Sequence, residues 1–296
     1  MNSAYGSLPG SKRDMYFPVA GVELNPIIPL IVGAISALIF SQVGLTGSIA
    51  TLPFMMSVLN FTSPSVSSTN LIYNILTPIG GIYSYKKEKR LLWRLGVTTG
   101  IGGVMGALIG PSIRTTILLD SIKFKAVFGL ILIFVGIRLV KHRQAHIEVG
   151  HVEDTSRNFL NQRFNFSKKT YSYNAIQLLI AGFLVGILST TIGIGTGFLL
   201  VPFYTTILKL PIYAVTGAAI ISTLIISTMG IIVYYSLNNG GATSPDIYLG
   251  LLIGVGGLIG GLFSAKIQPR FSSNFLHKFL GTILLLWAAA YLFQSL

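Results

Sequence analysis

The chain has 296 residues, of which 52% are hydrophobic and only 10% are charged, and its mean hydropathy is +0.72. A soluble domain carries about 25% charged residues, so this composition excludes an ordinary water-soluble protein and indicates lipid as the solvent. The net charge is +13, but the basic residues lie between apolar stretches and therefore indicate membrane orientation rather than nucleic-acid binding.

Ten helical segments are predicted in two groups of five, after an N-terminal extension over residues 1–25. The first group is expected at Pro26–Val43, Ser48–Asn60, Pro64–Tyr85, Leu92–Ile113 and Ser121–Val140. The second group is expected at Tyr173–Ile192, Gly197–Lys209, Ile212–Leu237, Pro245–Ile267 and Asn274–Phe293. The predicted fold class is an all-α polytopic membrane protein, with transmembrane repeats over 26–141 and 173–296 joined by a cytoplasmic linker over 142–172.

The two groups are copies of one another. Gly44 corresponds to Gly193 and Pro53 to Pro202, a shift of 149 residues in both cases. Other matches at this shift are Leu30/Leu179, Gly33/Gly182, Phe54/Phe203, Gly81/Gly230 and Tyr85/Tyr234. Further on, where the second half has five extra residues, Gly96, Gly102, Gly103 and Gly106 correspond to Gly250, Gly256, Gly257 and Gly260. An ordered series of matching Gly and Pro residues indicates an internal duplication.

Each half breaks its own first helix. The break reads GLTGSIATLP from Gly44 to Pro53 and GIGTGFLLVP from Gly193 to Pro202. The segment after each break has 13 residues, which reach about 20 Å as a helix and cannot cross a membrane core of about 30 Å. Each half is therefore expected to open with a glycine-broken helical hairpin whose tip lies within the membrane.

The distribution of charge predicts opposite orientations for the two halves. Each half crosses the membrane an odd number of times, so the repeats should be inverted. A cytoplasmic loop at Tyr85–Leu92 leaves only Lys12, Arg13, Arg114, Lys123 and Lys125 outside, of 21 Lys and Arg residues. This positive-inside pattern predicts a multi-pass protein of the cell membrane with both termini extracytoplasmic and the central linker cytoplasmic.

The glycine tips are predicted to form a central anion site. Inverted repeats with broken helices bind their substrate near the midplane, where helix N-termini offer N–H groups to an anion. The candidate binding residues are Gln42, Gly44, Thr46, Gly47, Ser48, Thr69, Asn70, Asn74, Thr191, Gly193, Gly195, Thr196, Gly197 and Thr223. For single Ser and Thr residues the alternative is a bond to their own helix or to a neighbouring one.

Several kinds of chemistry have no support in the sequence. No Asp or Glu falls inside a predicted span, since Glu23, Asp120 and Asp246 lie at the edges, no nucleotide-binding motif is present, and no carboxylate pair or triad indicates an enzyme. The histidines His142, His146 and His151 lie in the linker and do not form a convincing metal site. We expect no cofactor, no metal and no nucleic-acid partner, and the oligomeric state, including a homo-oligomer, is left open.

The paired breaks resemble those of the TauE/SafE family. The residues that carry the resemblance are Gly44-Leu-Thr-Gly-Ser with Pro53, Gly193-Ile-Gly-Thr-Gly with Pro202, and Ser68-Thr69-Asn70. The first break has fewer glycines than is usual in that family, and Gly217-Ala218-Ala219 stands where a Thr-Ser pair is common. The resemblance implies export of small sulfur-containing anions such as sulfite or organosulfonates.

Three kinds of membrane protein fit these features to different degrees. The leading hypothesis is a secondary transporter of small sulfur-containing anions that works by alternating access. An anion channel with the same site, or a carrier of another small anionic metabolite, is the alternative. A carrier of cations or neutral metabolites lacks the carboxylates expected for coordination, although backbone carbonyls could replace them.

Overall fold

The computed structural model describes residues 14–41, 45–141, 151–154, 160–167, 169–237, 243–267 and 273–294. Helices lie at all ten predicted positions. The first half contains α1 (Ile27–Phe40), α2 (Ser48–Pro53) continued by the π-helix η2 (Phe54–Val58), α3 (Ser65–Lys87), α4 (Trp93–Ala107), α5 (Gly110–Thr116) and α6 (Ser121–Val140). The second half contains α7 (Ala175–Ile192), α8 (Gly197–Pro202) continued by η3 (Phe203–Ile207), α9 (Ile212–Ser236), α10 (Ile247–Ile267) and α11 (Ser273–Phe293).

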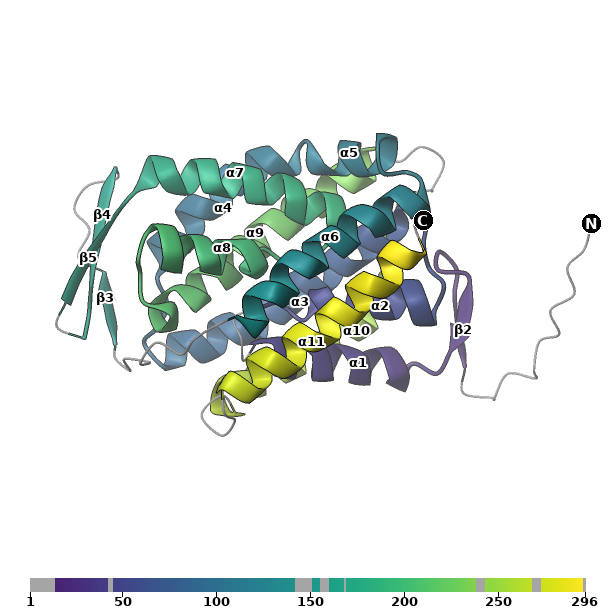
Figure 1. The fold of residues 1–296 in the computed structure, drawn as a ribbon, viewed down its shortest axis with the longest axis horizontal. Coiled ribbons are helices and arrows are strands. Elements are labelled where there is room, and N and C mark those ends of the chain that lie inside the picture. Colours follow the sequence, from purple (N-terminus) through teal and green to yellow (C-terminus); the bar gives the residue numbers. More distant parts are fainter. Residues whose placement is uncertain are drawn as a thin grey trace, which may run out of the picture.

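The all-α prediction is wrong at the two ends of the bundle, where short antiparallel sheets lie (Figure 1). Strands β1 (Met15–Phe17) and β2 (Val22–Leu24) form a hairpin within the predicted N-terminal extension. Strands β3 (Val152–Asp154), β4 (Asn161–Phe166) and β5 (Lys169–Asn174) form a sheet within the predicted linker. Alternate residues of β4, including Phe164 and Phe166, are buried, which is the period-two pattern of a half-buried strand.

The predicted helix at Leu92–Ile113 is divided into α4 and α5. The division falls at Leu108 and Ile109, and Pro111, in the second position of α5, has no N–H with which to continue the hydrogen bonding of α4. The short helix α5 then places Gly110, Pro111 and Arg114 in the bundle. As a result Arg114, which the charge count places in an external loop, is fully buried.

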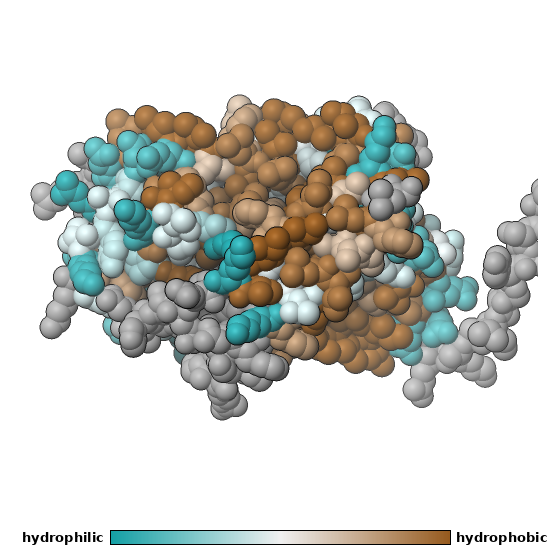
Figure 2. Space-filling view, in the orientation of Figure 1, coloured by the Kyte–Doolittle hydropathy of each residue, from teal (hydrophilic) through white to brown (hydrophobic). Residues whose placement is uncertain are grey.

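The outer surface of the helices is apolar. On α7 the side chains of Ile176, Ile180, Leu184 and Leu188 are 40–57% exposed, whereas the intervening Val185 is buried. Figure 2 shows a hydrophobic band over the middle of the molecule and hydrophilic residues at both ends. Within the described residues, Trp93–Thr116, Ala175–Ile192 and Ile212–Ser236 are long and apolar enough to cross a membrane, and further apolar helices are shorter. This surface is suited to lipid rather than water.

Helices from opposite halves pack against each other in matching pairs. Helix α1 packs on α10, and α7 packs on α4. In the first pair, Gly33 lies against the carbonyl of Ile253; in the second, Gly182 lies against the carbonyl of Thr99. Gly256 against Leu30 and Gly102 against Leu179 repeat the correspondence. A side chain at any of these glycines would collide with backbone, so the close approach of the helices requires glycine.

The long helices α3 and α9 are antiparallel. Gly81, near the end of α3, packs on Ile220 near the start of α9, and Gly230, near the end of α9, packs on Leu71 near the start of α3. Helices α6 and α11 are antiparallel too, since Gly129 packs on Leu292 and Gly136 packs on Leu285. Each of these pairs joins corresponding helices of the two halves.

Both sheets are attached to the ends of the bundle. The turn of the β1–β2 hairpin is held by Asp246, whose Oδ2 accepts from the N–H groups of Val19 at 3.1 Å and Ala20 at 3.0 Å. At the opposite end, the N–H of Val152 in β3 donates to the carbonyl of Lys89 at 2.9 Å. The hairpin therefore marks the end where α3 begins, and the three-stranded sheet marks the end where α3 finishes (Figure 1).

Candidate functional site

The two glycine tips contact each other inside the bundle. The N–H of Gly195 donates to the hydroxyl of Ser48 at 2.8 Å. The Ser48 hydroxyl also bonds to that of Thr46 at 2.9 Å, and Thr46 lies directly against Gly195, where a Cβ would collide with its side chain. Gly193 ends α7 in the left-handed conformation at φ 88°, which glycine adopts at no steric cost. The backbone breaks predicted from sequence thus meet at one point.

Asn70 of α3 ties the two tips together. Its amide Nδ2 donates to the carbonyl of Ser48 at 3.0 Å and to the carbonyl of Gly193 at 2.9 Å. Its Oδ1 accepts from the hydroxyl of Thr51 at 2.5 Å. The side chain is buried, so these bonds replace hydration that the site does not offer. Asn70 holds the tips in place and leaves no donor for a ligand in this state.

Asn74, one turn after Asn70, is only partly bonded. Its Nδ2 donates to the carbonyl of Gly193 at 3.1 Å, and within the described residues its buried Oδ1 has no partner. Thr77, less than one turn further along α3, likewise has a buried hydroxyl oxygen without a partner in the described part of the chain. These two groups are capable of bonding a ligand or water.

The second tip is held from α9 as well. The N–H of Thr196 donates to the hydroxyl of Thr223 at 3.2 Å, and the two hydroxyls lie 2.8 Å apart. The Thr196 hydroxyl also donates to the carbonyl of Ala219 at 3.2 Å. Two N–H groups of this tip, those of Gly195 and Thr196, therefore already have hydroxyl acceptors. At these two N–H groups, a hydroxyl oxygen occupies the place where an oxyanion oxygen would accept a hydrogen bond.

Not every predicted residue lies in this arrangement. The residues that meet at the tips are Thr46, Gly47, Ser48, Asn70, Asn74, Gly193, Gly195, Thr196, Gly197 and Thr223. Thr69 instead accepts from the N–H of Asp246, and Thr191 donates to the carbonyls of Gly110 and Ile187. Both of these hydroxyls therefore bond neighbouring segments of the protein, which was the alternative to ligand binding for single Ser and Thr residues. Gln42 and Gly44 lie outside the described residues.

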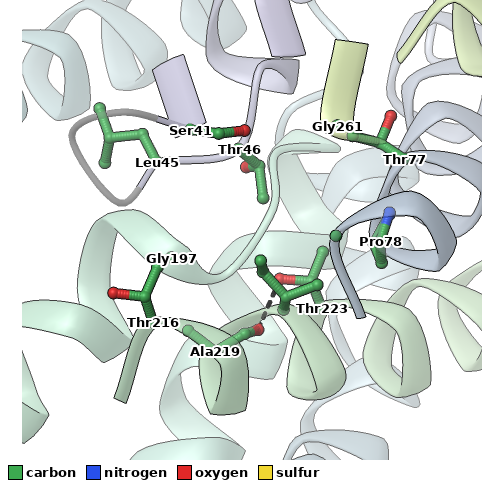
Figure 3. Close-up of a pocket in the computed structure, with 12 residues that line it drawn as sticks. Ser41, Leu45, Thr46, Thr77, Pro78, Gly197, Thr216, Ala219, Thr223 and Gly261 are labelled. Atoms are coloured by element: carbon green, nitrogen blue, oxygen red, sulfur yellow. Dashed lines mark hydrogen bonds between the residues drawn. The ribbon is translucent and has the colours of Figure 1, made fainter. Parts of the chain in front are cut away.

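A cavity opens beside the tips and is lined by both halves. Together with its opening it encloses about 470 Å³. It is lined by Ser41, Leu45, Thr46, Thr77, Pro78, Gly81, Gly197, Thr216, Ala219, Ile220, Thr223 and Gly261. Figure 3 shows Thr46 and Thr77 across the cavity from Thr216 and Thr223. None of these lining residues is charged, so small side chains, hydroxyls and backbone form the walls.

The cavity lies on one side of the tips only. Its residues come from the second half of α3, the first half of α9 and the end of α10. Because α3 and α9 are antiparallel, all of these parts lie toward the three-stranded sheet. On the other side of the tips, buried hydrogen bonds join α5 to the start of α3 (Arg114 to Ser67) and the end of α9 to the end of α7 (Tyr234 to Thr190). Among the described residues, the cavity beside the tips thus lies toward the three-stranded sheet, and the contacts on the other side of the tips, called the closed side below, are buried.

Several residues of the site are missing from the sequence prediction. Thr77, Thr216 and Gly261 line the cavity, yet hydroxyls and glycines are so common in this chain that their types carried no signal. The buried cation Arg114 was assigned to a loop because the kink before Pro111 was not anticipated. A basic residue three positions after a Gly-Pro pair within an apolar stretch is the signal that could have indicated it.

Comparison with known proteins identifies the family of the chain. A sequence profile described as "Sulfite exporter TauE/SafE" matches residues 29–291, nearly the whole chain. The chain belongs to the TauE/SafE family. As a TauE/SafE protein it is a membrane transporter, and nothing in the family points to an enzyme. No solved structure matches the chain.

Similar proteins occur in bacteria and archaea, and each is described as a "Probable membrane transporter protein". A relative from Xylella fastidiosa (strain 9a5c) is 24% identical over 252 residues, which cover 84% of this TauE/SafE chain and 88% of that protein. One from Bacillus subtilis (strain 168) is 29% identical over 184 residues, covering 60% and 66%. One from Methanocaldococcus jannaschii is 25% identical over 273 residues, covering 88% and 92%.

Proposed function

We propose that this TauE/SafE protein is a secondary transporter that exports small sulfur-containing anions, such as sulfite or organosulfonates, by alternating access. The observation that carries the proposal is the meeting of two glycine-broken helix starts in one hydroxyl-rich site, with Gly195 bonded to Ser48 across the halves. Backbone N–H groups and hydroxyls bind an oxyanion without placing a permanent charge in the wall of the site. The description of the matching family supports the sulfur-containing substrate.

An inverted repeat underlies the proposed mechanism. Two observations support it: the corresponding helices α3 and α9 are antiparallel, and glycine contacts recur in pairs across the halves. A rotation that exchanges the halves would move the cavity from one side of the tips to the other. Both states would then be built from equivalent contacts, which alternating access requires.

The closed end favours a carrier over a channel. A channel needs a continuous path, whereas the cavity among the described residues lies toward one end and the contacts on the other side of the tips are buried. In the proposed orientation the termini are extracytoplasmic and the linker is cytoplasmic, so the cavity faces the cytoplasm. An exporter is expected to accept its substrate in this state.

Flux measurements test the proposed function. Proteoliposomes that contain the purified protein and are preloaded with sulfite are expected to take up labelled methanesulfonate by counterflow, with saturation at millimolar concentration. Liposomes without protein serve as the control. Absence of counterflow for every sulfur-containing anion would refute the proposal, and single-channel currents in a planar bilayer would support the channel instead.

Thiol labelling tests which side of the tips is open. The natural chain has no cysteine, so a single introduced cysteine is the only reactive thiol. Thr216→Cys in the cavity is expected to react from the cytoplasmic face with a membrane-impermeant maleimide at least about tenfold faster than Ser227→Cys. Both residues lie on α9 and are buried, but they are 11 residues, or about 16 Å, apart along the helix.

The two positions are matched controls for each other. Excess sulfite, by occupying the cavity, is expected to slow the reaction of Thr216→Cys and to leave Ser227→Cys unchanged. Equal rates at the two positions, or faster reaction from the extracytoplasmic face, would contradict the proposed state.

A further inference from the structure

Arg114 is a buried cation on the closed side of the tips. Its side chain has no exposed surface, and it is the largest fully buried side chain in the described part of the protein. No carboxylate within the described residues lies at ion-pair distance from Arg114. The buried Arg90, at the opposite end of α3, differs in this respect because it forms a salt bridge with Glu88. The charge of Arg114 is therefore not neutralised by the protein around it.

The guanidinium group is only partly bonded. Its Nε donates to the hydroxyl of Ser67 at 3.2 Å, and its Nη1 donates to the carbonyl of Leu118. The ring of Phe124 lies 3.9 Å below the guanidinium carbon, a favourable cation–π contact. Its Nη2 is buried and has no partner among the described residues. A buried charge with an unused donor is costly, because neither water nor a counter-ion offsets its lost hydration.

Arg114 is connected to the second glycine tip through Ser67. The backbone of Ser67, whose hydroxyl accepts from Arg114, lies against Gly193, where a Cβ would meet the Ser67 carbonyl oxygen at 2.5 Å. The carbonyl of Gly110, at the start of the same short helix, accepts from the hydroxyl of Thr191 at 3.0 Å. The cation therefore belongs to the wall between the tips and the closed end.

We propose that Arg114, together with Ser67, is a second oxyanion-binding position, which receives the transported anion on its way from the tips to the closed end. This inference rests on the proposed function. A guanidinium group bonds two oxygens of one oxyanion through parallel N–H groups, and the free Nη2 supplies one of them. A sulfite or sulfonate group would provide the missing counter-charge when it arrives. The cation thus gives the site a charge-based preference that the uncharged cavity lacks.

Anion-dependent thermal stability tests the position. We expect sulfite to raise the unfolding midpoint of the purified wild-type protein in a saturable manner, because an anion bound to the folded state stabilises it. Arg114→Gln is expected to weaken the apparent affinity for sulfite at least about tenfold. Without anion, the midpoint of Arg114→Gln is expected to equal or exceed that of the wild type, because the uncompensated charge is gone.

Arg138→Gln is the matched control. Arg138 is a half-buried arginine of α6 that bonds the carbonyl of Phe198 at 3.3 Å and lies toward the other end of the bundle. Its replacement is expected to leave the response to sulfite unchanged. Arg114→Lys keeps the charge but not the paired donors, so its affinity for sulfite is expected to fall about tenfold too.

Each result separates the inference from the proposed function. Arg114→Gln with wild-type affinity for sulfite would overturn the inference, as would a lower anion-free midpoint combined with a full response. If Arg114→Gln cannot be purified, unchanged affinity in Arg114→Lys overturns the inference and weakened affinity supports it. A wild-type protein that shows neither stabilisation nor counterflow would instead refute the proposed function.

Discussion

Replacing Gly193 with alanine is expected to abolish transport and to lower the unfolding midpoint by several degrees. Gly193 has φ 88°, a conformation that costs an ordinary residue about 1–2 kcal/mol. A Cβ at this position would also lie 2.5 Å from the carbonyl oxygen and 2.6 Å from the Cα of Ser67. Both obstacles are backbone, so the second tip would have to move away from α3. That movement would break the bonds that Asn70 and Asn74 make to the Gly193 carbonyl.

Gly21 provides a matched control for the conformational part of this effect. It has φ 69°, and no atom lies within 4 Å of the place a Cβ would occupy. Gly21→Ala therefore carries the conformational penalty without the collision. Counterflow and thermal unfolding of both variants separate the two contributions. If Gly193→Ala transports normally, or if Gly21→Ala is equally damaging, the close contact between the second tip and α3 is not important for function.

The sequence was most informative where the conformation or close packing of the backbone requires a particular residue, here glycine or proline. Glycine followed by a short apolar segment and proline predicted both broken hairpins, and the structure has α2 and α8 at those places. The glycine matches between the halves reappear as paired helix contacts, since Gly33 and Gly182 each approach a carbonyl of the opposite half. These features could be predicted because no other residue type fits such close approaches.

Features that depend on tertiary packing could not be predicted in the same way. The linker sequence contains only a short alternating pattern, and β4 forms because Phe164 and Phe166 find an apolar surface on the end of the bundle. The burial of Arg114 depends on the direction in which α5 leaves the kink before Pro111. The roles of Thr69 and Thr191 were decided by which carbonyl or N–H group lay nearest. The sequence does not show which backbone group a given Ser or Thr hydroxyl will bond, because all of them offer the same donor and acceptor.

The two tips are held by different side chains, although they occupy corresponding positions in the two halves. Asn70 corresponds to Ala219 in the second half, so only the first half supplies an amide that bridges both tips. In return, the second half contributes Thr223, which accepts from its own tip. Exchange of the halves would therefore produce two states that share a design but differ in stability. In the proposed alternating-access mechanism, such a difference would bias the resting protein toward one of the two states.

Asn70→Ala is expected to destabilise the protein more than Asn74→Ala and to reduce counterflow below about a tenth of wild type. The alanine would remove two donors and one acceptor, leaving the hydroxyl of Thr51 and the carbonyl of Ser48 with only the long bond of 3.4 Å between them. Each buried polar group left without a partner costs about 1–3 kcal/mol. The Gly193 carbonyl would still accept from Asn74, so the second tip keeps one attachment to α3.

Asn74→Ala is the appropriate comparison because the two residues lie one turn apart on the same buried face of α3. Asn74 makes one bond and already has an unpartnered Oδ1 in the described part of the chain, so its removal costs less in folding. If that oxygen contacts the substrate, Asn74→Ala will alter the concentration dependence of counterflow while the unfolding midpoint stays close to wild type. Asn70→Ala will instead lower the midpoint and the maximal rate together, because the two tips lose their common attachment. Equal midpoints for the two variants would show that Asn70 is not the tie between the tips, and the geometry of the site would then have to rest on the bond between Gly195 and Ser48 alone.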